Sequence, residues 1–149
     1  MQVIAYDPYV APPVFAEYQV EPVSLEELAA RSDYVSCHLP LNEHTRGMLD
    51  ARFFSQMKPT AYFINTSRGA VVKEADLIAA LEAGKIAGAG LDVFEKEPIA
   101  PDHPFCRMEN VILTPHSASY SDATFAALYR RVGETALTLA RGGLHAFVA

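Results

Sequence analysis

The sequence has 149 residues, of which half are apolar and a fifth are charged, and its formal net charge is −6. This composition is typical of one globular domain, and the negative charge argues against nonspecific binding to nucleic acid or to an anionic membrane. No apolar run reaches the roughly 18 residues of a membrane span, and the first residues lack the regions of a signal peptide. Cys37 and Cys106 have no metal-ligand spacing, so we expect a cytoplasmic protein with reduced thiols and no metal.

Short apolar runs separated by polar turns make up the first part of the chain. Residues 3–6 predict a strand that ends at Asp7, and the three prolines of residues 8–16 predict a loop. Ser24 and Glu27 have the spacing of a capping box, which begins a helix. Beyond it the sequence predicts a strand at 34–38, a polar turn at 39–46 and a short helix from the N-cap Asp50 to Met57.

The alternation of strands and helices continues to the end of the sequence. Strands are predicted at 61–64, 87–93 and 111–113, with a helix at 74–83 that Gly84 ends and a loop at 94–108. Ser121 or Ser119 caps a long final helix, whose apolar residues recur at helical spacing until Gly142 and Gly143. This order predicts an α/β fold with a parallel, doubly wound sheet, and short continuous apolar strands are expected where both faces are covered.

Polar side chains that a core does not require stand at the ends of four predicted strands: Asp7, Arg68, Asp92 and His116. Ligands of open α/β sheets bind at the carboxyl ends of the strands. Arg68 offers a planar charged fork that suits a carboxylate, and Asp7 could accept hydrogen bonds from ribose hydroxyls. Each residue also has a structural interpretation, since Asp7-Pro8 is a common turn, a lone arginine is usually a surface charge and a lone histidine is usually structural. A buried Asp92 would need partners.

Glu97 and His116 stand on loops that flank one short predicted strand. If that strand is 111–113, the two loops meet at one edge of the sheet. A carboxylate beside an imidazole fixes its orientation and favours its charged form, which makes a general acid. Together with Arg68, this pair suggests reduction of a 2-oxo acid or the reverse reaction, for which a separate hydride carrier is needed.

Seven segments of the sequence form a pattern whose order and spacing are specific. They are Tyr6-Asp7-Pro8, His38-Leu39-Pro40-Leu41 with Thr45, Asn65-Thr66-Ser67-Arg68-Gly69, Leu81 to Gly84, Gly88 to Val93, Glu97-Pro98 and Thr114-Pro115-His116. This pattern resembles the D-isomer-specific 2-hydroxyacid dehydrogenases from Val3 to about Gly143. The resemblance implies a Rossmann-type fold, the cofactor NAD and interconversion of 2-oxo acids and D-2-hydroxy acids.

The resemblance also implies roles for individual residues. Arg68 would hold the substrate, His116 would be the general acid and base, and Glu97 would orient His116. Asp7 would contact the adenosine ribose, which favours NAD over NADP because a 2′-phosphate would face its carboxylate. Asp92 would lie near the nicotinamide carboxamide, and the remaining residues expected to line the cofactor are Leu39, Pro40, Thr45, Thr66 and Ser67.

Two departures from the family pattern qualify these roles. Residues 41–45 and Tyr120 to Asp122 look most like the branch that contains the C-terminal-binding-protein corepressors, which typically has a tryptophan where this chain has Ser119. No G-x-G-x-x-G precedes residues 3–6, although the family carries this loop one helix earlier. We therefore expect residues 1–149 to be the C-terminal portion of an NAD-binding domain, a partial sheet without its first strand, its glycine-rich loop or the substrate domain.

The expected partial sheet has consequences for assembly and activity. The first strand would lie beside residues 3–6 and 61–64, so without it an apolar edge is open to pairing with another chain. We expect a homo-oligomer, weak or no NAD binding and no turnover by the chain alone, because the glycine loop would bind the pyrophosphate. A dehydrogenase for a small 2-oxo or 2-hydroxy acid is the favoured function; an NAD-sensing corepressor-like module and a non-catalytic remnant are the alternatives.

Overall fold

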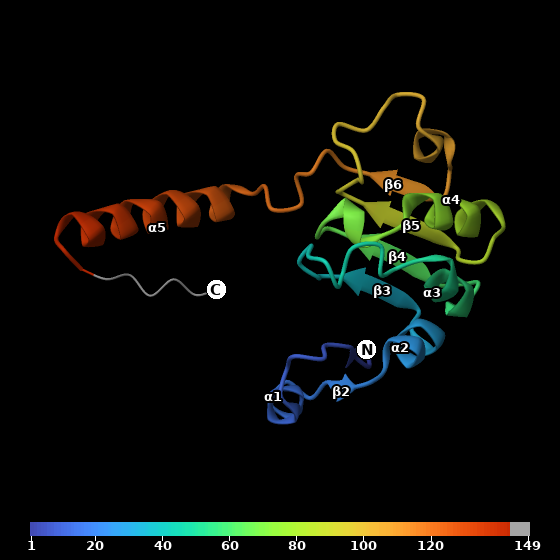
Figure 1. Ribbon diagram of the computed structural model, residues 1–149. Helices are drawn as coiled ribbons and strands as arrows, with labels where there is room; N and C mark the ends of the chain where they lie inside the picture. The colour runs from blue at the N-terminus through green and yellow to red at the C-terminus, as the bar shows by residue number, and fades with distance from the viewer. Residues whose placement is uncertain (144–149) are drawn as a thin grey trace. The chain divides into compact units, whose positions relative to one another are not determined.

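The computed structural model describes residues 1–143, which fall into a first compact unit, Met1–His116, and a second that begins at Ser117. The first unit contains a four-stranded parallel sheet (Figure 1). Its strands, in spatial order, are β3 (Tyr34–Cys37), β4 (Tyr62–Asn65), β5 (Gly88–Leu91) and β6 (Val111–Leu113). The predicted α/β fold with a parallel sheet is confirmed.

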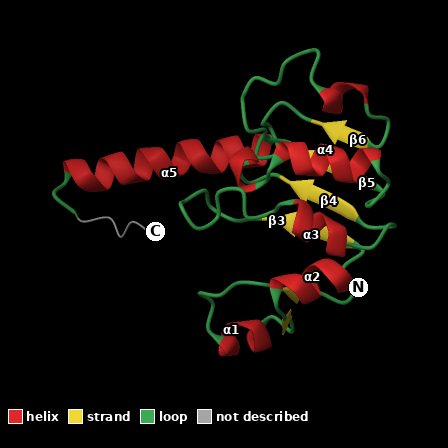
Figure 2. Cartoon of the chain, turned by 45° about the vertical axis from the view of Figure 1, so that its right-hand side comes forward, coloured by secondary structure: helices red, strands yellow, loops and turns green. Residues whose placement is uncertain are grey.

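Three helices of the first unit contribute to its core: α2 (Leu25–Arg31), α3 (Ala51–Gln56) and α4 (Glu74–Glu82). Figure 2 shows α3 and α4 in front of the strands. The rings of Phe54 on α3 and Phe63 on β4 meet edge to face, with their centroids 5.3 Å apart. Both side chains are fully buried, and so is Leu77 of α4. Burial of these apolar side chains holds α3 and α4 against the sheet.

The other face of the sheet is more exposed than the apolar strands predicted. In β3, the side chains alternate between exposed and buried, so Val35 is buried while its neighbour Tyr34 is 68% exposed. Tyr34 stacks on Tyr62 of β4 at a centroid distance of 5.7 Å. Cover on both faces was expected, but within the described residues only the face toward α3 and α4 is fully buried at β3 and β4.

The ends of the helices follow the predicted capping residues. Ser24 and Glu27 form the capping box of α2, and the Asp50 carboxylate accepts hydrogen bonds from two amides of α3. Gly84 follows α4 with a φ of +61°, a left-handed conformation that glycine adopts without strain. Ser121, not Ser119, is the N-cap of α5 (Asp122–Ala140).

Several expected boundaries were wrong. Residues 12–17 form a short helix, α1 (Pro12–Glu17), where a loop was predicted, because proline is suited to the first helical positions. The first strand is only β1 (Ile4–Ala5), and it pairs in parallel with β2 (Glu21–Pro22), a two-residue strand that the sequence did not indicate. The predicted loop 94–108 contains a 3₁₀ turn, η2 (Pro104–Arg107).

The open edge of the sheet lies at β3 and not at residues 61–64 as predicted. β4 is internal because it pairs with β3 on one side and with β5 on the other. β1 and β2 form a separate two-stranded sheet, and a cleft of about 850 Å³ has both β1 and β3 in its wall. The open edge therefore belongs to β3, and the cleft beside it separates β3 from β1.

The second unit consists mainly of the 19-residue helix α5. None of its side chains is buried, and the apolar residues of its predicted stripe are exposed. The predicted stop holds, since Gly142 follows the helix with a φ of +74°. Among the helices that the structure describes, none is long and apolar enough to cross a membrane.

Candidate functional site

The carboxyl ends of three neighbouring strands meet at one edge of the sheet, as predicted. Asn65, Leu91 and Leu113 end β4, β5 and β6, and they stand opposite one another in the parallel register. The hydrogen bonds continue past the strands, because the amide of Asp92 donates to Asn65 O at 3.0 Å and the amide of His116 donates to Asp92 O at 2.9 Å. These hydrogen bonds bring three features to the same edge: Asp92, His116 and the turn that follows β4.

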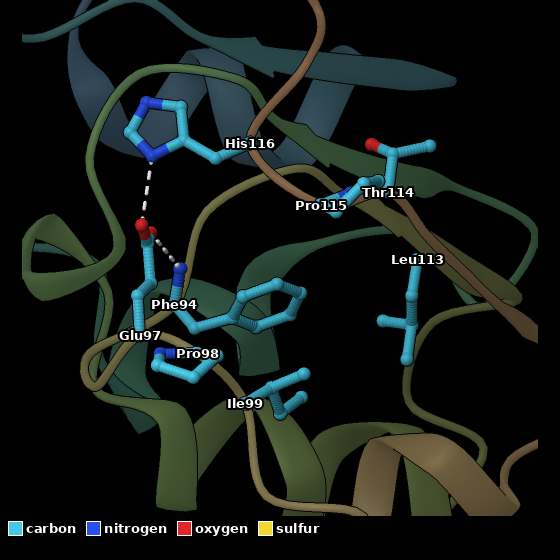
Figure 3. Close-up of a pocket in the computed structure, with 8 residues that line it drawn as sticks. All are labelled: Phe94, Glu97, Pro98, Ile99, Leu113, Thr114, Pro115 and His116. Atoms are coloured by element: carbon cyan, nitrogen blue, oxygen red, sulfur yellow. Dashed lines mark hydrogen bonds and ion pairs between the residues drawn. The ribbon is translucent and has the colours of Figure 1, made fainter.

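Glu97 and His116 form a close pair at this edge (Figure 3). His116 Nδ1 lies 2.7 Å from Glu97 Oε2, and the other carboxylate oxygen accepts the Phe94 amide at 3.0 Å. The hydrogen bond from His116 and then that from the Phe94 amide hold the pKa of the Glu97 carboxyl below its usual value. A carboxylate that stays ionised beside the imidazole can orient it and stabilise its protonated form.

The backbone of His116 adopts a left-handed conformation with a φ of +52°. Such a conformation is uncommon for a residue other than glycine and costs on the order of 1–3 kcal/mol where surrounding contacts hold it in place. Here the amide of His116 is bonded to Asp92 O at the end of β5. This conformation aims the imidazole at Glu97, and the sequence carried no signal for it.

Asp92 is buried, with an exposed fraction of 3%. The hydroxyl of Thr114 donates a hydrogen bond to its carboxylate. The expectation that a buried Asp92 needs partners is confirmed. Because Thr114 follows β6 and Asp92 follows β5, this hydrogen bond also joins the two strand ends.

Arg68 belongs to a turn that the buried side chain of Asn65 organises. Asn65 Oδ1 accepts the amide of Ser67 at 3.0 Å and its hydroxyl at 2.9 Å, while Asn65 Nδ2 donates to Arg68 O at 3.1 Å. The side chain of Arg68 is exposed, and its Nη1 donates to Ser67 O at 2.7 Å. The turn therefore has a fixed backbone and presents Arg68 to solvent.

An apolar cavity of about 540 Å³ adjoins the Glu97–His116 pair (Figure 3). Its wall combines the two paired side chains with Phe94, Ile99 and Leu113. An apolar wall strengthens the electrostatic interactions of the groups beside it, because it lowers the local dielectric constant. Arg68 and Asp92 do not line this cavity.

The residues expected to contact the cofactor are distributed over two places. Asp7 and Leu39 line the cleft beside β1 and β3, whereas Thr66, Ser67 and Asp92 follow β4 and β5. Asp7 is exposed, and one carboxylate oxygen accepts the Tyr9 amide at 2.9 Å, so the turn interpretation holds for it. An exposed carboxylate at a strand end also fits the hydroxyls of a ribose.

Two of the expected cofactor residues use their hydroxyls within the protein. The buried Thr45 donates to Pro40 O at 2.6 Å, which closes the loop after β3. The Ser67 hydroxyl bonds to Asn65 and lies 3.3 Å from the Cys37 sulfur. These side chains shape the loops, while Pro40 and Thr66 are exposed.

The chain matches known proteins over most of its length. Residues 1–118 match the family model described as D-isomer specific 2-hydroxyacid dehydrogenase, NAD binding domain. The chain belongs to this family. Its cofactor is therefore NAD, and the exposed Asp7 carboxylate beside the cleft fits that group. No cluster of three or more potential metal ligands occurs among the residues that the structure describes.

Relatives of the chain include reductases and dehydrogenases. A glyoxylate reductase of Korarchaeum cryptofilum is 46% identical over 142 residues, which are 95% of this chain and 43% of that protein. A human glyoxylate reductase/hydroxypyruvate reductase is 47% identical over 109 residues, or 73% of this chain and 33% of that protein. The chain thus spans less than half the length of these relatives.

Solved structures of the family have the same fold. The NAD-complexed D-isomer specific 2-hydroxyacid dehydrogenase of Lactobacillus delbrueckii ssp. bulgaricus is 33% identical, with a TM-score of 0.87, over 97% of this chain and 47% of that one. The D-lactate dehydrogenase of Aquifex aeolicus, complexed with NAD and lactic acid, is 33% identical with a TM-score of 0.83, over 95% of this chain and 47% of that one.

Proposed function

We propose that the chain carries the acid–base and carboxylate-binding groups of an NAD-dependent dehydrogenase that interconverts a small 2-oxo acid and a D-2-hydroxy acid. The observation that carries this proposal is the 2.7 Å contact between His116 Nδ1 and Glu97 Oε2 beside the strand ends. The relatives named as reductases and dehydrogenases support an enzyme over the corepressor-like alternative.

In the proposed reaction, each side chain has one task. The guanidinium of Arg68 binds the substrate carboxylate through paired hydrogen bonds. During reduction, His116 gives a proton from Nε2 to the carbonyl oxygen as it becomes a hydroxyl, and it takes the proton back in the reverse direction. Glu97 holds Nδ1 and stabilises the protonated ring. NAD, when bound, accepts or supplies the hydride.

The cofactor contacts are proposed at the two places that the fold provides. Asp7 accepts hydrogen bonds from the adenosine ribose, with Leu39 beside it in the cleft. Asp92 would lie near the nicotinamide carboxamide. The other proposed contact residues are Pro40, Thr45, Thr66 and Ser67.

We also propose that the isolated polypeptide is inactive and associates with further copies in the cytoplasm. The open edge of β3 and the adjacent cleft support this proposal, because an unpaired strand edge offers hydrogen-bonding groups to another chain.

Titration of glyoxylate into the chain at a saturating NADH concentration tests the role of Arg68. We expect saturable changes in the NMR signals of Arg68 and His116, and we expect Arg68→Gln to abolish them. Arg107→Gln is the matched control, since Arg107 is an exposed arginine on η2. Equal binding by Arg68→Gln would contradict the proposed role. NADH oxidation by the chain alone, lost in His116→Asn, would support the reaction but contradict the proposed inactivity.

A further inference from the structure

The turn that carries Arg68 touches the segment that carries Glu97 through backbone atoms. A Cβ atom added to Gly69 would lie 1.9 Å from Phe94 C and 2.0 Å from Phe94 O. Only glycine allows so close an approach between two main chains. Phe94 is therefore held on its carbonyl side by Gly69, while its amide donates to the Glu97 carboxylate.

The next residue of the same segment, Glu95, is held by a reciprocal pair of hydrogen bonds with Glu74. The Glu95 carboxylate accepts the Glu74 amide at 2.9 Å, and the Glu74 carboxylate accepts the Glu95 amide. Glu74 opens α4, whose N-cap Lys73 provides no side-chain cap. Glu95 therefore caps the first turn of a helix from a distant loop, and a negative charge there is favourable.

A third group completes this contact. The imidazole of His103 lies with Nε2 3.4 Å from Glu74 Oε2, and the Glu74 side chain is only 14% exposed. Burial is the largest cause of a raised pKa at Glu74, and the neighbouring Glu95 charge adds to it. The mostly buried Glu74 carboxylate is thus fixed between the Glu95 amide and His103.

We propose that Glu74 and Glu95 are positioning residues that brace the Phe94–Glu97 segment against α4 and so keep the Glu97 carboxylate on His116. This inference rests on the proposed function, because it concerns the same acid–base pair. If the brace is released, Phe94 and Glu97 gain freedom, and the contact of Glu97 with His116 weakens.

The test measures the pKa of the Glu97 carboxyl by carbon-detected NMR in the intact chain. Glu74→Ala removes the acceptor of the Glu95 amide, whereas Glu74→Gln removes the charge but keeps an acceptor. Loss of a nearby negative charge lowers the pKa of a carboxyl, while loss of the contact with His116 raises the pKa of Glu97. A rise in the pKa of Glu97 therefore indicates loss of its contact with His116, whereas a fall indicates only the loss of a nearby negative charge. Glu82→Ala, an exposed change on the same helix, is the matched control.

We expect the pKa of Glu97 to rise toward its ordinary value in Glu74→Ala and to stay low in Glu74→Gln and Glu82→Ala. Glu95→Ala, at an exposed position, provides a second variant if Glu74→Ala does not fold, and it should shift the pKa in the same direction. A low pKa for Glu97 in both alanine variants would overturn the brace while leaving the proposed function intact. An ordinary pKa in the unmodified chain would instead remove the pair on which the proposed function depends.

Discussion

Among the glycines of the chain, Gly69 leaves the least room for a Cβ atom, so its replacement with alanine is a severe test. The added methyl would meet Phe94 C at 1.9 Å, Phe94 O at 2.0 Å and the Glu95 amide nitrogen at 2.5 Å. All three are backbone atoms, so no side chain can rotate away. The main chains of the Arg68 turn and of the Phe94–Glu97 segment must separate by more than 1 Å to reach ordinary contact distances.

The expected cost is at the upper end of that of overpacking, about 3 kcal/mol, because relief requires a backbone shift. A loss of this size lowers the melting temperature of a domain of this length by about 10 °C. Gly90→Ala is the matched control, since its Cβ would meet only Ile64 Cγ1, at 4.0 Å. That substitution should stabilise the strand by about 0.5 kcal/mol, because alanine loses less backbone entropy than glycine.

Thermal unfolding followed by circular dichroism measures both variants against the unmodified chain. NMR would show the chemical shifts of Phe94, Glu97 and His116 moving in Gly69→Ala and not in Gly90→Ala. A melting temperature for Gly69→Ala within about 2 °C of the unmodified chain would refute the close approach and the reasoning built on it.

Two further substitutions test the Glu97–His116 pair and the open edge of β3. His116→Asn should keep the fold, since asparagine tolerates a positive φ, and it should raise the pKa of Glu97 because its largest hydrogen bond is lost. The pKa of Glu97 is lowered in the folded state, so the stabilising effect of the pair is complete above about pH 4.3 and is lost as the pH falls further. The free energies of unfolding of His116→Asn and of the unmodified chain, measured in urea, should therefore converge in acid. A difference that stays constant with pH would count against the pair. Ser36→Lys, on the open edge strand β3, should reduce self-association in light scattering, and a monomeric unmodified chain at high concentration would contradict the open-edge argument.

Sequence periodicity and capping residues predicted most of the fold of the first unit. The parallel strands followed from short apolar runs, and α2 and α3 followed from Ser24 and Asp50, because these signals are local. The predictions failed where pairing between distant residues decides the structure. β2 has two residues and no apolar run, so only its pairing with β1 defines it. The position of the open edge likewise depends on the order of strands in space.

The candidate site was predictable where residues follow strand ends and was not predictable where backbone geometry decides. The meeting of Glu97 and His116 was expected from the strand between them and is confirmed at 2.7 Å. The left-handed backbone of His116 and the reciprocal contacts of Glu74 with Glu95 have no signal in a single sequence. Asn65 was visible in the motif, but its role in organising the turn required the three hydrogen bonds of its side chain.

Calorimetric titration of NADH into the 149-residue chain tests how much of the cofactor site this chain retains. We expect no binding or weak binding, with a dissociation constant on the order of 1 mM or above, or about −4 kcal/mol at most. Asp7→Asn should weaken it further, and Asp102→Asn, an exposed aspartate outside the cleft, should leave it unchanged. Saturable binding at micromolar NADH would contradict the expected incomplete cofactor site, and equal weak binding by Asp7→Asn would contradict the proposed role of Asp7.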